Sequence, residues 1–167
     1  MATLDDNIKT QLSGKTLQAV TFALGSEEYG VDIAQVQEIN RMVTITHVPR
    51  APQFMEGVIN LRGQLIPIID LRTRFGMERS ERTKNTRIVV TEIGSKRIGM
   101  VVDSVSEVLR IPVEQIEDAP DLVAGVETEY IRGVGKMGDR LIIMLDLGRV
   151  ISGSEKVQLQ KLESAAA

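Results

Sequence analysis

The sequence predicts a mainly β protein made of two small, related barrels. Three features support this prediction: short segments in which apolar and polar residues alternate, turns that contain glycine between them, and a pattern that starts again halfway along the chain. Of the 167 residues, 43% are apolar, which is sufficient for a packed core. The chain has no cysteine or tryptophan and few aromatic residues, so this core must be mainly aliphatic.

The strand signals begin with a hairpin in the first half. Residues 17–24 and 29–33 alternate as strands, and Gly25-Ser26 supplies the turn between them. Residues 65–71 form a nearly continuous apolar run, which is typical of a strand covered on both faces. Because the run contains Pro67, which has no N–H to donate, we expect an edge strand or a bulge there.

The second half repeats the order of strands and turns in the first. A shift of 69 positions, followed by a shift of 76 after an insertion near residues 123–130, aligns the two halves. True duplication explains this agreement better than the general likeness of β-rich sequences, because the order of strands, turns and chain breakers also matches. The matched pairs include Leu24-Gly25-Ser26 with Ile93-Gly94-Ser95, Glu38 with Glu107, Gly57-Val58 with Gly133-Val134, Leu65-Ile66 with Leu141-Ile142, and Asp70-Leu71 with Asp146-Leu147.

Each repeat has room for about five short strands, and sheets of that size close into barrels because closure removes unpaired edges. We expect one domain over residues 17–151. Its two barrels would span roughly 30–86 and 87–151, with the N-terminal strand exchanged or shared. Residues 1–16 are expected to form a flexible tail and residues 152–167 a short helix. The interface between two such barrels offers a groove for a partner.

The residues offer no constellation for catalysis. His47, the only histidine, lies on a strand expected over residues 44–48 and has no visible catalytic partner. Without cysteine, and with isolated carboxylates only, no metal or cofactor site is expected. Asp70 and Asp146 occupy matched positions and are expected to accept backbone N–H bonds at strand ends. A small β-barrel enzyme or nucleotide-binding protein remains an alternative, although the glycine-rich residues 133–138 resemble a phosphate loop only weakly.

Charge and hydropathy narrow the range of partners. The formal net charge is −3, with acidic and basic residues interspersed, so no nucleic acid is expected. No signal peptide or bilayer-spanning stretch is evident, and the lack of cysteine is compatible with a reducing compartment. We therefore expect a cytoplasmic protein that is not inserted in a membrane.

Some residues suit protein binding instead. Arg62 lies beside a tight turn, where it could pair with a carboxylate on a partner or remain solvated. A small barrel cannot bury every apolar residue near its edge, so some must line the interface between the barrels. The candidates are Val36, Ile39, Val105 and Val108.

Several motifs resemble the CheW family of chemotaxis coupling proteins. The similarity runs from about Leu17 to Ile151 and is carried by segments in both halves. These are Tyr29-Gly-Val-Asp-Ile-Ala-Gln-Val-Gln-Glu-Ile39, Pro52-Gln-Phe-Met-Glu-Gly-Val-Ile-Asn-Leu-Arg-Gly63, Ile66-Pro-Ile-Ile-Asp-Leu-Arg72, Val101-Val-Asp-Ser-Val-Ser-Glu-Val108 and Tyr130-Ile-Arg-Gly-Val134.

The resemblance implies two intertwined, five-stranded SH3-like barrels with short helical segments. It also implies a non-catalytic adaptor that couples chemoreceptor tips to the regulatory domain of the histidine kinase CheA. Such adaptors are monomers in isolation and join rings in the receptor array beneath the membrane. A coupling protein of a different chemosensory pathway is an alternative. The receptor-binding residues implied are Val36, Glu38, Ile39, Arg62, Val105 and Val108, and those for the kinase are Val43, Ile45, Glu56 and Gly57.

Overall fold

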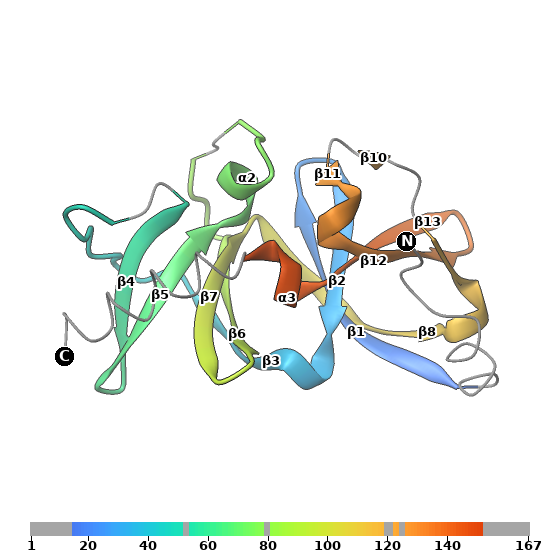
Figure 1. Cartoon of the computed structure of the whole chain (residues 1–167), viewed down its shortest axis with the longest axis horizontal. Helices are drawn as coiled ribbons and strands as arrows, with labels where there is room; N and C mark the ends of the chain where they lie inside the picture. The colour runs from blue at the N-terminus through green and yellow to red at the C-terminus, as the bar shows by residue number, and fades with distance from the viewer. Residues whose placement is uncertain (1–14, 52–53, 79–80, 119–121, 124–125, 152–167) are drawn as a thin grey trace.

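The computed structural model describes residues 15–51, 54–78, 81–118, 122–123 and 126–151. Figure 1 shows two sheets side by side, with α3 at their junction. The first half contains β1 (Thr16–Leu24), β2 (Glu27–Asp32), η1 (Ile33–Gln35), β3 (Val36–Arg41), β4 (Met55–Leu61), β5 (Gln64–Asp70) and α2 (Leu71–Arg74). The second contains β6 (Arg87–Ile93), β7 (Lys96–Val102), β8 (Ser104–Pro112), η2 (Val113–Gln115), β9 (Ile116–Glu117), β10 (Leu122–Val123), β11 (Val126–Glu127), η3 (Thr128–Tyr130), β12 (Ile131–Met137), β13 (Arg140–Leu145) and α3 (Leu147–Val150).

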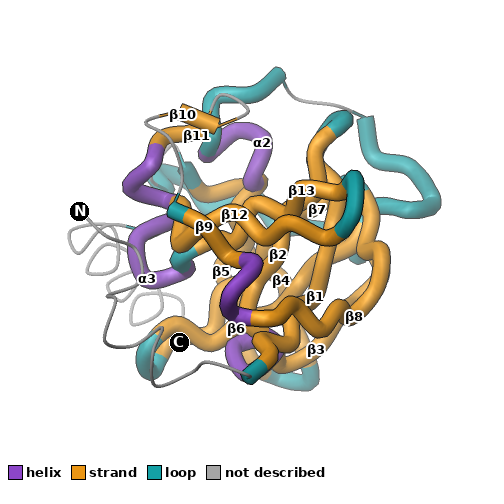
Figure 2. The backbone as a smooth tube through the Cα atoms, turned by 90° about the vertical axis from the view of Figure 1, so that its right-hand side faces the viewer, coloured by secondary structure: helices purple, strands orange, loops and turns teal. Residues whose placement is uncertain are grey.

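The two halves exchange their hairpins. The six-stranded sheet has the order β8-β1-β2-β13-β12-β9, and the five-stranded sheet has the order β3-β6-β7-β5-β4. Hairpin β1–β2 of the first half therefore pairs with strands of the second half, and β6–β7 does the reverse. Figure 2 shows that strands dominate the molecule and that the helices are short. The mainly β prediction, with two intertwined small barrels, is confirmed.

The exchange bears on where one barrel ends and the other begins. A cut between residues 86 and 87 does not follow the sheets, because β6 and β7 belong to the five-stranded sheet with β3, β4 and β5. We propose instead that one barrel comprises β3 to β7 and the other comprises β1, β2 and β8 to β13. The helix expected over residues 152–167 lies outside the described residues.

Both sheets close in the same way. Strand β8 pairs with β1, and the chain then turns through η2 into β9, which pairs with β12 at the opposite edge. In the five-stranded sheet, β3 pairs with β6, and Thr46 further along the chain forms an antiparallel bridge with Val58 of β4. Only Thr46 makes this bridge within the strand predicted over residues 44–48, so that prediction was wrong in extent.

The repeat predicted from the sequence is present in three dimensions. A shift of 76 places β4 (Met55–Leu61) on β12 (Ile131–Met137) and α2 (Leu71–Arg74) on α3 (Leu147–Val150). Asp70 and Asp146 end the preceding strands, and their side chains accept hydrogen bonds from the backbone N–H groups of Arg72 and Gly148. The structural role predicted for both aspartates is therefore confirmed.

The strands have two buried faces because each separates a barrel interior from the core between the barrels. In β13, Ile142 and Met144 face the interior of the six-stranded barrel, whereas Ile143 and Leu145 join a central core that contains residues of both sheets. Strand β5 alternates in the same way, which explains its continuous apolar run. It is nevertheless an interior strand, so the edge position suggested by Pro67 was wrong. Pro67 is tolerated because the parallel pairing of β5 with β7 begins only at Ile68.

A row of aromatic rings crosses the central core. The ring centroids of Phe22 and Tyr29 are 6.0 Å apart, those of Tyr29 and Phe75 are 6.0 Å apart, and those of Phe75 and Tyr130 are 5.6 Å apart. Tyr29 is completely buried, and its hydroxyl group has no hydrogen-bond partner among the described residues. Burial raises the pKa of this hydroxyl, and nearby Glu27 adds to the effect. The ring thus stabilises the core while its hydroxyl group is costly to bury.

We predict that Tyr29→Phe leaves the free energy of unfolding unchanged or raises it by up to about 1 kcal/mol, because it removes an unsatisfied hydroxyl and keeps the ring. Tyr29→Ala should lower the same quantity by about 3–5 kcal/mol through loss of the ring. Urea denaturation of the wild type and both variants measures these changes. A marked loss of stability in Tyr29→Phe would show that the hydroxyl has a partner.

Candidate functional site

The candidate surface is built on a short motif that occurs once in each half. Val36-Gln37-Glu38-Ile39 lies on β3, and Val105-Ser106-Glu107-Val108 lies on β8. Each copy contains a β-bulge. In β3 the register against β6 shifts between Val36 and Glu38. In β8 the register against β1 shifts between Val105 and Glu107, which lie opposite Phe22 and Thr21. A bulge inserts one residue and so changes which side chains share a face.

The bulge places the two apolar residues of each motif on the same face, towards the central core. Val36 and Val105 are partly buried against that core. Ile39 and Val108 lie opposite Val89 and Val20, which belong to it, yet 41% and 51% of these two residues remain exposed. The apolar surface of the central core therefore continues onto both edge strands, where it is exposed to solvent. We call Val36, Ile39, Val105 and Val108 the edge-strand set.

The carboxylate of the first motif points the other way and meets the β4–β5 turn. Both oxygens of Glu38 accept hydrogen bonds from Arg62 Nη2, at 2.9 and 2.8 Å. Arg62 has a φ of 53° and the following Gly63 a φ of 86°, as expected for a two-residue hairpin turn of the I′ type. The Gly63 N–H donates to Asn60 Oδ1 at 2.9 Å. Asparagine and glycine support this turn, which holds an exposed arginine in an uncommon conformation.

The pairing changes the titration of Glu38. The hydrogen bond from Arg62 lowers the pKa of this carboxyl below its ordinary value of 4.5, with a smaller contribution from Asn40. The Arg62 guanidinium is thus paired with Glu38 within the chain. Most of the arginine side chain nevertheless remains exposed, so a partner can still reach it.

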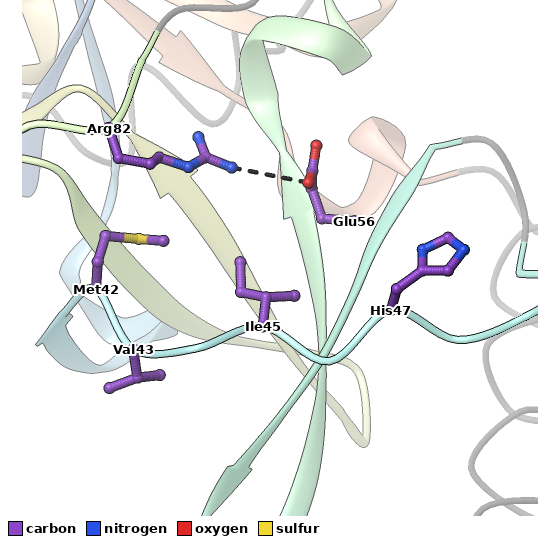
Figure 3. A pocket seen from close by; sticks show the side chains of 6 residues that line it. All are labelled: Met42, Val43, Ile45, His47, Glu56 and Arg82. Carbon is purple, nitrogen blue, oxygen red and sulfur yellow. Dashed lines mark ion pairs between the residues drawn. The ribbon is translucent and has the colours of Figure 1, made fainter.

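A second candidate surface lies beside β4. Met42, Val43, Ile45, His47, Glu56 and Arg82 line a hollow of about 430 Å³. Figure 3 shows the first four on the segment after β3, and Arg82 and Glu56 pointing towards each other with 3.7 Å between their charged atoms. Three of the four residues assigned to the kinase by resemblance thus line one hollow.

Gly57, the fourth residue of that assignment, acts through the backbone. A side chain there would overlap the Thr46 carbonyl oxygen and approach Ile45 Cγ2 to 2.7 Å. The close approach is needed because Thr46 and Val58 exchange two backbone hydrogen bonds of 2.9 Å. Gly57 therefore allows residues 43–47 to lie against β4 and does not itself line the hollow.

Sequence reasoning missed Arg82 and did not place Met42 or His47 in a site. Arg82 lies in the charged stretch after α2, which gave no sign of a specific contact. In the structure its Nη1 donates to Asp70 Oδ2 at 2.9 Å, and Asp70 is almost completely buried. The one signal in the sequence was Asp70 itself. A buried aspartate at a strand end needs a second hydrogen-bond donor besides a backbone N–H, and Arg82 supplies it.

Two kinds of site are not found in the part of the chain that the structure describes. No three histidine or acidic side chains there are grouped as metal ligands. In the same residues, no helix has the length and apolar character required to cross a membrane.

Two small barrels that share a core and expose apolar residues on edge strands are typical of a protein-binding module. Comparisons with known proteins agree. The model of the CheW-like domain matches residues 18–155, and the chain belongs to this family. Chemotaxis protein CheW of Klebsiella aerogenes is 40% identical over 148 residues, covering 87% of this chain and 89% of that protein. Chemotaxis protein CheW of Treponema pallidum is 33% identical over 155 residues, covering 90% and 89%.

A solved structure gives the same result for the fold. The crystal structure of scaffolding protein TtCheW from Thermoanaerobacter tengcongensis superposes with a TM-score of 0.76 at 39% identity, covering 82% of this chain and 88% of that one. The family and its named members identify this chain as a non-catalytic scaffolding or coupling protein of chemotaxis.

We predict that the Glu38 carboxyl titrates below 4.5 in the wild type and returns towards that value in Arg62→Ala, because the main cause of the shift is removed. The contribution of a lowered pKa to stability is present above 4.5 and is lost as the pH falls through the folded-state value. Carboxyl carbon shifts in an NMR pH titration measure both values. An identical Glu38 pKa in the two proteins would contradict the pairing.

We predict that Gly57→Ala lowers the free energy of unfolding by about 1–3 kcal/mol, because the added methyl group forces residues 43–47 away from β4. The amides of Thr46 and Val58 should exchange hydrogen faster. Glu56→Ala, at the neighbouring position, is the control, since it leaves the approach of the two backbones intact. Unchanged protection of both amides in Gly57→Ala would refute this role.

Proposed function

We propose that this protein binds the cytoplasmic tips of chemoreceptors and the regulatory domain of the histidine kinase CheA. By holding both, it supports kinase activation and assembly of the receptor array. It works in the cytoplasm, peripheral to the membrane-bound array, and is a monomer in isolation that joins rings within the array. The observation that carries the proposal is the presence of two candidate surfaces made of different side chains.

The edge-strand set with Glu38 and Arg62 suits the receptor. A receptor tip is a helical hairpin, and one flank of a helix presents apolar residues bordered by polar ones. Ile39 and Val108 offer exposed apolar contacts, and the Glu38–Arg62 pair offers both charges. Charges at the rim of an interface affect register and choice of partner more than affinity. Modest affinity is sufficient, since an array tethers every partner near its site.

The hollow beside β4 suits the kinase domain. Its apolar lining includes Val43, which is 49% exposed, and Ile45, and its charged lining includes Glu56 and Arg82. An apolar centre with charged residues at its border is typical of interfaces between folded domains. Five large apolar side chains are exposed among the described residues, and Ile39, Val43 and Val108 are three of them. All three fall on the two proposed surfaces.

We predict opposite effects for substitutions on the two surfaces. Arg62→His, Arg62→Glu or Glu38→Arg should weaken binding of a receptor tip fragment and leave binding of the kinase regulatory domain unchanged. Ile45→Asp should do the reverse, raising the Kd for the kinase domain about tenfold or more, because a charge would be buried at the contact. Titration of each variant against both partners, by calorimetry, measures the effects.

Thermal unfolding of each variant provides the control for these titrations. A variant that unfolds at a much lower temperature would show that the residue is structural. Loss of both partners in a stable variant would contradict separate surfaces, and failure of the wild type to bind either partner would refute the proposed function.

A further inference from the structure

Glu107 is the duplicate of Glu38, and it too is held by an arginine. Arg140, at the start of β13, donates from Nε and Nη2 to the two oxygens of Glu28, at 3.0 and 2.7 Å. Its Nη1 lies 3.4 Å from Glu107 Oε1. One arginine thus connects the β12–β13 hairpin with β2 and with the edge strand β8.

The same positions are connected in the other barrel. In the internal repeat, Arg140 corresponds to Gln64 and Glu28 corresponds to Arg97. The Arg97 guanidinium donates a hydrogen bond to Gln64 Oε1, just as Arg140 donates to Glu28. The two pairs, related by the internal repeat, therefore occupy matched positions and make matched contacts. The contact is kept although the chemical types differ between the two copies.

The copies differ in how the glutamate of the motif is held. Glu38 is bound by Arg62 of the β4–β5 turn, but the position matched to Arg62 is Gly138, which has no side chain. Glu107 must therefore be held by Arg140, which in addition binds Glu28. Arg140 does for the second barrel what Arg62 and Gln64 do separately in the first.

The contact matters because of what lies next to Glu107. Val105 and Val108 flank it on β8 and face the opposite side of the strand, where they belong to the edge-strand set. β8 is an edge strand that pairs on one side with β1. Fixing the Glu107 side chain to a neighbouring hairpin restrains the strand at the bulge, where the ladder is weakest.

We propose that Arg140 is a positioning residue for the receptor-binding surface: by holding Glu107 against the β12–β13 hairpin, it sets the place of Val105 and Val108 on β8. The inference rests on the function proposed above. Arg140 itself is paired with Glu28 and Glu107 and need not touch the receptor. Its counterpart in the first barrel, the Glu38–Arg62 pair, places Val36 and Ile39 in the same manner.

The test compares Arg140→Gln with Lys136→Gln in the full chain. Lys136 is a suitable control because it lies in the same hairpin and makes an exposed ion pair of 3.0 Å with Glu117. Arg140→Gln should raise the Kd for a receptor tip fragment about two- to fivefold, as expected for a partly exposed charge pair. Its Kd for the kinase regulatory domain and its melting temperature should match the wild type. Lys136→Gln should change none of the three.

Hydrogen exchange supplies a readout that does not depend on binding. The amides of Glu107 and Val108 should exchange faster in Arg140→Gln, with partial recovery in Arg140→Lys, which keeps the charge but loses the two-pronged contact. Unchanged receptor binding in Arg140→Gln, or an equal loss of the kinase domain, would overturn the inference alone. If the wild type bound no tip fragment, both the proposed function and this inference would be refuted.

Discussion

The central apolar core, shared by both sheets, is the constraint on which the rest of the structure depends. Each half donates a hairpin to the sheet of the other half, so the aromatic row from Phe22 to Tyr130 joins residues of both repeats. Neither half can complete its barrel alone. Because strands such as β5 and β13 are buried on both faces, a change on either face affects two cores at once.

The shared core also determines where binding surfaces can form. Its apolar residues continue onto β3 and β8, which are the edges of the two sheets, and there Ile39 and Val108 reach solvent. The bulge in each motif leaves a glutamate on the opposite face of the strand, where an arginine of a neighbouring hairpin pairs with it. The strands thus carry the exposed apolar residues, and we propose that the Glu38–Arg62 and Glu107–Arg140 pairs hold these strands in place. Preorganised surfaces of this kind lose little freedom on binding.

Much of the fold could be predicted from the sequence, because the residues that reveal the repeat are also residues that the fold requires. Asp70 and Asp146 were expected at strand ends and are found there as helix caps. The exchange of hairpins could not be derived from the repeat alone, because a duplicated hairpin fits either sheet equally well. Arg82 was missed since its partners, Asp70 and Glu56, are brought near it only by folding. Of the two alternatives for Pro67, the edge strand was wrong, because a single proline does not reveal where pairing with the next strand begins, whereas a bulge is present in the β4–β5 pairing.

We propose that one molecule holds both partners at the same time, through separate surfaces. The most direct test titrates a receptor tip fragment into the protein alone and into the protein saturated with the kinase regulatory domain, with sedimentation velocity to detect the complexes. Separate surfaces should give the same receptor Kd in both titrations and a sedimenting complex of all three components. Competition between the two partners, seen as a receptor Kd that rises with kinase concentration, would contradict it.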